Sequence, residues 1–201
     1  MSREQFIWGL SNGVTVLAVS AAFWLGLAAW TSGPGILLIA AAPILPFSGL
    51  LAWRAQRLRR LAPGFSRANL RSAPKGSSIR RIGLAFNLVG TAQTLSVGLV
   101  GFICWKLNRF DLLWPLIGLV ISLHFLPLGR IFNVRPYYVL GVLGSAVALI
   151  SILGFSGGAR TVAAGLGLGL LIGGCAAFLV ANAAAIADTA LQPRASPVEG
   201  S

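Results

Sequence analysis

Long uninterrupted runs of apolar residues, separated by short polar segments, dominate the pattern along this chain. A helix needs about 20 predominantly apolar residues to cross roughly 30 Å of hydrocarbon. Runs of that length predict an all-α fold, a polytopic membrane protein built as a bundle of six transmembrane helices in a single domain over residues 1–187. The predicted spans lie at about residues 8–30, 35–53, 82–105, 112–132, 136–155 and 161–187.

The polar connections between the later runs are short enough to fix how neighbouring helices run. Only "KLNRFD" separates the third run from the fourth, and only "NVR" separates the fourth from the fifth. Connections this short make consecutive helices antiparallel. The first run contains Ser11 and Asn12 and is longer than the apolar region of a signal peptide, so we expect it to be retained as a helix.

Composition agrees with a bilayer as the solvent. The chain is 56% hydrophobic and 10% charged, with a mean hydropathy of +0.83, which leaves too little polar surface for a soluble globule. Sixteen Lys and Arg residues against four acids give a net charge of +12. No aromatic interleaving or nucleic-acid motif accompanies these charges, so we expect no nucleic-acid partner.

The basic residues are distributed unevenly between the predicted loops, and this predicts the orientation. Nine of them lie between residues 54 and 81, with no acid among them, so this loop is expected in the cytoplasm. Both termini then become cytoplasmic, with thirteen basic residues inside and only Lys106, Arg109 and Arg160 outside. We predict a bacterial inner membrane location, and a disordered C-terminal tail over 188–201.

The basic loop 54–81 has two interpretations. Clustered Lys and Arg beside a membrane helix attract anionic lipid headgroups at about 1 kcal/mol per charge, so the loop is a candidate site for these lipids or for a cytoplasmic partner. The alternative is a topology signal alone. Leu58 and Leu61 follow the face of Leu51, which predicts that the second helix extends into this loop until Pro63 and Gly64.

Small residues recur every fourth position in the last run and predict a helix-packing face. This stripe contains Gly165, Gly169, Gly173 and Ala177. The third run carries a shorter stripe of Gly90, Thr94 and Gly98. Two interpretations remain open: packing within the bundle, or a seam with a second copy or another membrane protein.

Three prolines fall inside the predicted spans, namely Pro43, Pro46 and Pro127. Proline removes a backbone donor, so we expect each to break its helix in the membrane and to free a carbonyl group.

One imidazole in an apolar span is the most conspicuous polar group. His124 and nearby polar residues have similar predicted depths, and together they form the candidate intramembrane site: His124, Thr91, Gln93, Thr94, Asn87 and Asn182. Either His124 is a structural hydrogen-bonding residue, held by Gln93, Thr91 or a carbonyl freed by Pro127, or it is a protonatable site reached by water. Arg130 and Arg135 are candidate vestibule or lipid-contacting residues at the inner end.

The chain lacks the residue sets that catalysis needs. No span holds a carboxylate pair or a Ser/His/Asp set, and Cys104 and Cys175 lie at different depths without metal-ligand neighbours. We therefore expect no enzyme activity, no cofactor and no metal. The preferred function is non-enzymatic, through helix packing or partner and lipid contacts; the alternative is a small-solute or proton-linked transporter or channel around His124.

The segment "GLVISLHFLPLGRIFNVRPYYVLG" resembles a group of small bacterial multi-pass membrane proteins that have no characterised activity. The resemblance rests on the pattern His124, Phe125, any residue, Pro127, Leu128, and covers roughly the second half of the chain. It implies a bacterial inner membrane but no activity, ligand or catalytic residue.

Overall fold

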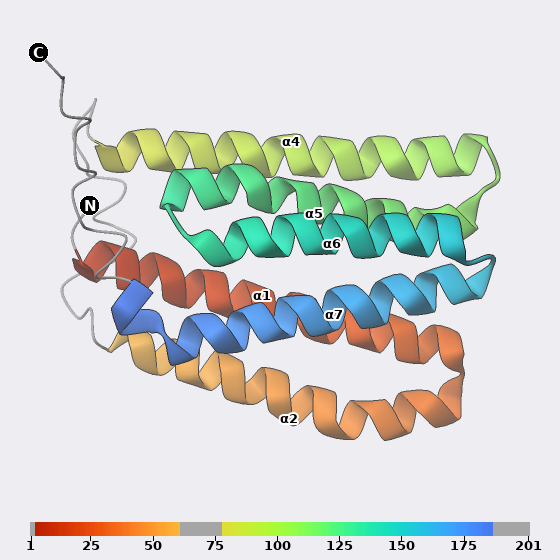
Figure 1. Ribbon diagram of the computed structural model, residues 1–201, viewed down its shortest axis with the longest axis horizontal. Helices are drawn as coiled ribbons and strands as arrows, with labels where there is room; N and C mark the ends of the chain where they lie inside the picture. The colour runs from red at the N-terminus through yellow and green to blue at the C-terminus, as the bar shows by residue number, and fades with distance from the viewer. Residues whose placement is uncertain (1–2, 61–77, 187–201) are drawn as a thin grey trace, which may run out of the picture.

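The computed structural model describes residues 3–60 and 78–186, which are almost entirely helical and contain no strand (Figure 1). Residues 61–77 of the basic loop and the predicted tail 188–201 lie outside the described residues. The elements in chain order are α1 (Arg3–Ser32), α2 (Pro34–Arg59), α4 (Ser78–Lys106), the short 3-10 helix η1 (Phe110–Leu112), α5 (Leu113–Phe132), α6 (Arg135–Gly154) and α7 (Gly158–Ala181).

Five segments in the described part of the chain are long and apolar enough to cross a membrane: Gly9–Ser32, Gly83–Lys106, Phe110–Phe132, Arg135–Gly154 and Gly158–Ala181. The prediction of an all-α protein is therefore confirmed, with several helices that are long and apolar enough to cross a membrane. The second predicted span, 35–53, coincides with α2, a helix that runs antiparallel to α1 (Figure 1).

α2 continues beyond its apolar run toward the basic loop. Leu51 and Ala55 are buried and Leu58 packs against the core, so one face of the helix stays covered up to its end at Arg59. The predicted helical extension is confirmed as far as that residue. Leu61 and the stop at Pro63 lie outside the described residues.

The predicted helix breaks at proline are wrong. Pro43 and Pro46 lie inside α2, and Pro127 lies inside α5. Each proline removes one backbone donor, and the remaining hydrogen bonds of a long membrane helix keep the helix continuous.

The last predicted span ends earlier than expected. α7 stops at Ala181, and residues 183–186 form a separate helical turn. Asn182 occupies the C-cap, and its side-chain amide donates a 3.0 Å hydrogen bond to the Phe178 carbonyl oxygen. The Asn182 backbone N–H donates to the same carbonyl oxygen at 3.0 Å, and the Ile186 N–H donates to the Asn182 carbonyl oxygen at 2.9 Å, so the helix is interrupted only locally at Asn182.

The helices form a curved row in which each packs on the next, in the order α2, α1, α7, α6, α5 and α4 (Figure 1). α1 and α7 occupy the centre and make the most extensive contact between any two helices. α4 stands at one end of the row, where it packs on α5 and on η1. α4 is consequently the least covered of the five candidate spans, with 6% of its window buried against 44% in α7.

The small-residue stripe of α7 lies against α1. A Cβ atom on Gly165 would lie 2.7 Å from the Trp24 carbonyl oxygen, and one on Gly169 would lie 2.5 Å from Leu25 Cγ. Gly173 faces Phe47 of α2 and Ala21 of α1. Ala177 is partly buried and packs against the core. The stripe therefore brings two backbones together inside the bundle, as the first of the two interpretations expects.

Large apolar side chains cover the outside of the row. Leu88 and Trp30 are each 72% exposed and Leu153 is 83% exposed, alongside many other exposed Leu, Val and Phe residues. A soluble monomer rarely carries so much contiguous apolar surface, whereas lipid tails solvate it without cost.

Adding a methyl group at Gly165 should destabilise the bundle by about 1–3 kcal/mol, because it would force α1 and α7 apart. Gly174 is the matched control on the same helix, since nothing lies within 4 Å of its Cβ position. Thermal unfolding of Gly165→Ala and Gly174→Ala in one lipid or detergent measures the difference. Equal melting temperatures for the two variants would contradict this packing.

Candidate functional site

His124 lies just past the middle of α5 and is half-buried. Its Nδ1 is 2.9 Å from the carbonyl oxygen of Ile121, one turn earlier on the same helix. A carbonyl oxygen only accepts, so Nδ1 carries the proton in this arrangement. The structure thus gives His124 a partner other than the three expected ones, which were Gln93, Thr91 and a carbonyl freed by Pro127.

The imidazole ring of His124 is the first of a row of aromatic rings that ends in the core. The rings of His124 and Phe125 are 4.7 Å apart, and Phe125 is 5.8 Å from Tyr137 of α6. Tyr137 is buried, and its hydroxyl oxygen would lie 2.8 Å from a Cβ atom on Gly13 of α1. This row joins α5, α6 and α1, so His124 borders a packed interior.

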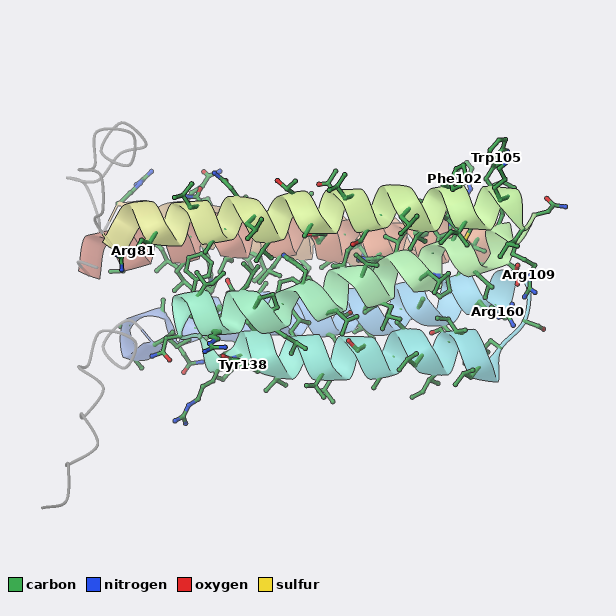
Figure 2. All side chains as sticks on the ribbon, turned by 90° about the horizontal axis from the view of Figure 1, so that it is seen from above. Arg81, Phe102, Trp105, Arg109, Tyr138 and Arg160 are labelled. Atoms are coloured by element: carbon green, nitrogen blue, oxygen red, sulfur yellow. The ribbon has the colours of Figure 1, made fainter. Side chains whose placement is uncertain are left out.

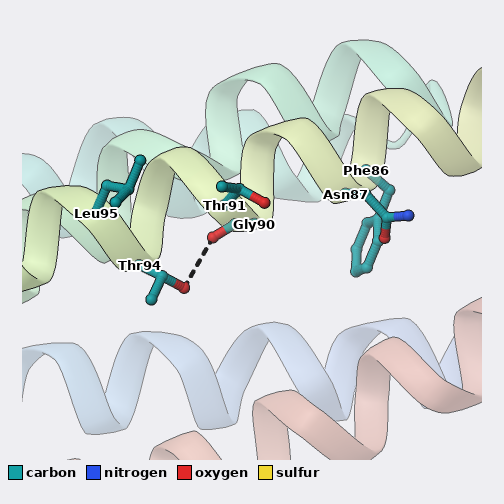
Figure 3. A pocket seen from close by; sticks show the side chains of 6 residues that line it. All are labelled: Phe86, Asn87, Gly90, Thr91, Thr94 and Leu95. Atoms are coloured by element: carbon teal, nitrogen blue, oxygen red, sulfur yellow. Dashed lines mark hydrogen bonds between the residues drawn. The ribbon is translucent and has the colours of Figure 1, made fainter.

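The polar residues predicted to surround His124 point in several directions. Asn87, Thr91 and Thr94 line a shallow depression on an exposed side of α4, together with Phe86, Gly90 and Leu95 (Figure 3). Gln93 is more covered than these three and does not line the depression. Asn182 is at the end of α7 and bonds to its own helix. The predicted cluster is therefore divided among separate places.

The depression belongs to one continuous face of α4, which we call the α4 face: Gly83, Asn87, Gly90, Thr91, Thr94, Gly98 and Gly101. A Cβ atom on any of its four glycines would meet nothing within 4 Å. Thr94 donates a 3.0 Å hydrogen bond to the Gly90 carbonyl oxygen (Figure 3). Asn87 and Thr91 are exposed and make no hydrogen bond within the described part of the chain.

Several other hydroxyl groups in the helices bond to their own backbone. Ser122, Ser145 and Ser151 each donate to the carbonyl oxygen four residues earlier, at 2.7 to 2.8 Å. This local bond satisfies a hydroxyl in apolar surroundings without a partner helix. The exposed side chains of Asn87 and Thr91 make no such bond.

Arg130 and Arg135 lie exposed on either side of the turn between α5 and α6. Asn133 adopts the left-handed conformation in this turn, with φ 55°, and the Val134 N–H donates to the Gly129 carbonyl oxygen at 3.1 Å. The tight turn holds both guanidinium groups at the same end of the bundle as Arg81, which Figure 2 labels. This position suits headgroup contact as well as a vestibule.

Sequence reasoning missed the polar centre at the opposite end of the bundle. Asp111 of η1 forms ion pairs with Arg109 and with Arg160 of α7. The available signal was that Asp111 is the single acid in any loop expected on the outer side. Its partner was not evident because Arg160 is 49 residues away in the chain.

Neither a protein-family model, nor a curated protein, nor a solved structure matches this chain. Function must therefore be argued from the geometry of the helices.

The neutral imidazole of His124 should be the Nδ1–H tautomer, because Nδ1 faces a carbonyl oxygen. Nitrogen NMR of the protein in bilayers, labelled with ¹⁵N in its one histidine, distinguishes the two tautomers. The histidine of the Ile121→Ala variant serves as a control, since it keeps the backbone acceptor and should give the same tautomer. A protonated Nε2 with a bare Nδ1 would contradict the hydrogen bond to Ile121.

Proposed function

We propose that this chain is a bacterial inner-membrane protein with six spans and both termini in the cytoplasm. It acts without catalysing a reaction, by packing one of its helices against a partner in the same bilayer. The uncovered α4 face is the observation that carries this proposal.

The distribution of charge supports the orientation. The C-terminal end of α2, the N-terminal end of α4 and the turn between α5 and α6 lie at one end of the bundle (Figure 1). That end carries most of the described basic residues: Arg54, Arg57, Arg59, Arg60, Arg80, Arg81, Arg130 and Arg135. The opposite end carries Lys106, Arg109 and Arg160, and its Asp111 offsets part of that charge. An excess of Lys and Arg marks the cytoplasmic side.

Contacts between a cationic side chain and an aromatic ring at the two ends of the bundle support a sixth span in α2. The Arg57 guanidinium lies 3.9 Å from the centre of the Trp53 ring at the inner end. At the outer end, Lys106 lies 5.1 Å from the centre of the Trp105 ring. Such pairs are typical of the headgroup layer, and α2 runs between the two layers beside α1. The exposed Arg54 and Arg57 suit contact with anionic lipid headgroups.

The α4 face suits a protein partner better than lipid. An amide or hydroxyl facing hydrocarbon without a partner is unfavourable by roughly 1–3 kcal/mol, and the exposed side chains of Asn87 and Thr91 have this problem. The four glycines beside them give lipid tails little to pack on, but they let another helix backbone approach closely.

A second copy of the chain is the partner that fits best. Gly83, Asn87, Gly90 and Thr94 are spaced at four, three and four residues, the pattern of a seam between parallel helices. A second copy inserted in the same orientation presents the same residues at the same depth. The Asn87 amide both donates and accepts, so two of them can pair across a two-fold axis.

Transport around His124 has less support. The polar side chains that such a site would need point in different directions, and the His124 Nδ1 is occupied by its own helix. The geometry therefore favours packing as the function and a structural hydrogen bond as the role of His124.

Reporter fusions test the orientation. An enzyme that is active only in the cytoplasm should be active when fused after Ser201 and inactive when inserted between Phe155 and Gly157. The positive-inside distribution is the physical reason for this expectation. Activity of an exclusively periplasmic reporter after Ser201 would reject the proposed topology.

Disulfide trapping tests the α4 face. With both native cysteines replaced by alanine, Gly90→Cys should cross-link two copies in native membranes under mild oxidation, because the two-fold axis brings the positions together. Leu88→Cys is the matched control, since Leu88 is 72% exposed at a similar depth on another face of α4. Equal cross-linking at the two positions would reject the seam, and absence of dimer at both would reject the second copy as partner.

A further inference from the structure

The outer end of the bundle contains an ion-pair network that the proposed function does not use. Asp111, in the connection between α4 and α5, accepts hydrogen bonds from Arg160 Nη1 and from Arg109 Nε, the latter at 3.1 Å. Figure 2 shows Arg109 and Arg160 at the same end of the helices. The network thus joins two connections that are far apart in the chain.

Asp111 supplies the negative charge that Arg160 needs in its position. Its side chain is only 16% exposed, and its Nε is buried without a hydrogen-bond partner in the described part of the chain. It also lies in the first turn of α7, where the positive end of the helix dipole disfavours a cation. Removal of the one carboxylate would leave a nearly buried, uncompensated charge, which is strongly unfavourable.

The network connects the pair of helices α4 and α5 to α7 at this end of the bundle. η1 packs on α4, α5 and α7, and the Asp111 to Arg160 pair is the described ionic link from that pair of helices to α7. Arg109 differs from Arg160, because it is 52% exposed and lies only two residues from Asp111. It therefore ties no second helix to the network.

A native thiol lies at the same place. Cys104, in the last turn of α4, is only 2% exposed, and its carbonyl oxygen accepts a 2.9 Å hydrogen bond from the Arg109 N–H. Cys104 is thus buried next to the connection that carries Asp111.

We propose that the ion pair between Asp111 and Arg160 is a latch that closes the outer end of the bundle. When the pair is broken, η1 separates from α7, the outer end of α4 moves, and Cys104 becomes accessible. The latch goes beyond the proposed function and does not require the α4 face to be an interface.

Labelling of Cys104 tests the latch. The protein is placed in lipid nanodiscs with Cys175→Ala as the background, so that Cys104 is the single thiol. A charged, membrane-impermeant maleimide should label this parent slowly. Asp111→Asn and Arg160→Gln should each raise the initial rate at least tenfold. Arg109→Gln is the matched control and should stay within about twofold of the parent.

A charge exchange distinguishes the ion pair from general loosening. The double variant Asp111→Arg with Arg160→Asp restores opposite charges and should label at a rate nearer the parent than either single variant. Single variants are scored only if they keep the helical circular dichroism of the parent. If the single variants lose this circular dichroism, only the double variant is scored. Slow labelling of its Cys104 supports the latch, and fast labelling overturns it. A folded Asp111→Asn protein with the parental rate also overturns it.

The failure of this proposal and the failure of the α4 seam are separable. Cross-linking through Gly90→Cys reports the contact between copies, and Cys104 labelling reports the outer end of one copy. Loss of the first result leaves the second unchanged.

Discussion

The close contact between α1 and α7 is the constraint on which the other helix positions depend. Gly165 and Gly169 remove the side chains that would separate the two backbones, so Trp24 can fill the space beside them while only 1% exposed. α2 then packs on α1, and α6 packs on α7, which places α5 and finally α4. In lipid, where apolar burial gives little driving force, such close packing has to supply the attraction between helices.

The sequence was sufficient to predict the membrane-crossing helices but not what each face of a helix meets. Apolar runs of sufficient length have one stable outcome in a bilayer, so the helices of the third, fourth and fifth runs begin and end within a few residues of the prediction. The prolines were misjudged because one missing donor does not break a long helix. The end of α7 was missed because the run stays apolar past Asn182, as far as Ala187.

The candidate site around His124 shows more clearly that the sequence does not determine what each face of a helix meets. Similar depth in the membrane suggested that Thr91 and Asn87 surround His124, but depth does not determine the direction of a side chain around its helix. The rotation of α4 is set by its single main neighbour, α5, and it turns these residues outward. The ion pair between Asp111 and Arg160 could not be predicted from the sequence either, because it forms between helices that the rest of the fold brings together.

The pairing of the first described helix with the last also has a consequence for biogenesis. α1 is synthesised before the other described helices, yet α7, the helix with which it makes the most extensive contact, is made only after four other long helices have been synthesised. During that interval, the buried face of α1 must be covered by lipid or by a chaperone of the insertion machinery. The contact between α1 and α7 therefore forms late, whereas neighbours in sequence such as α1 with α2 and α5 with α6 can pack as soon as both helices are made.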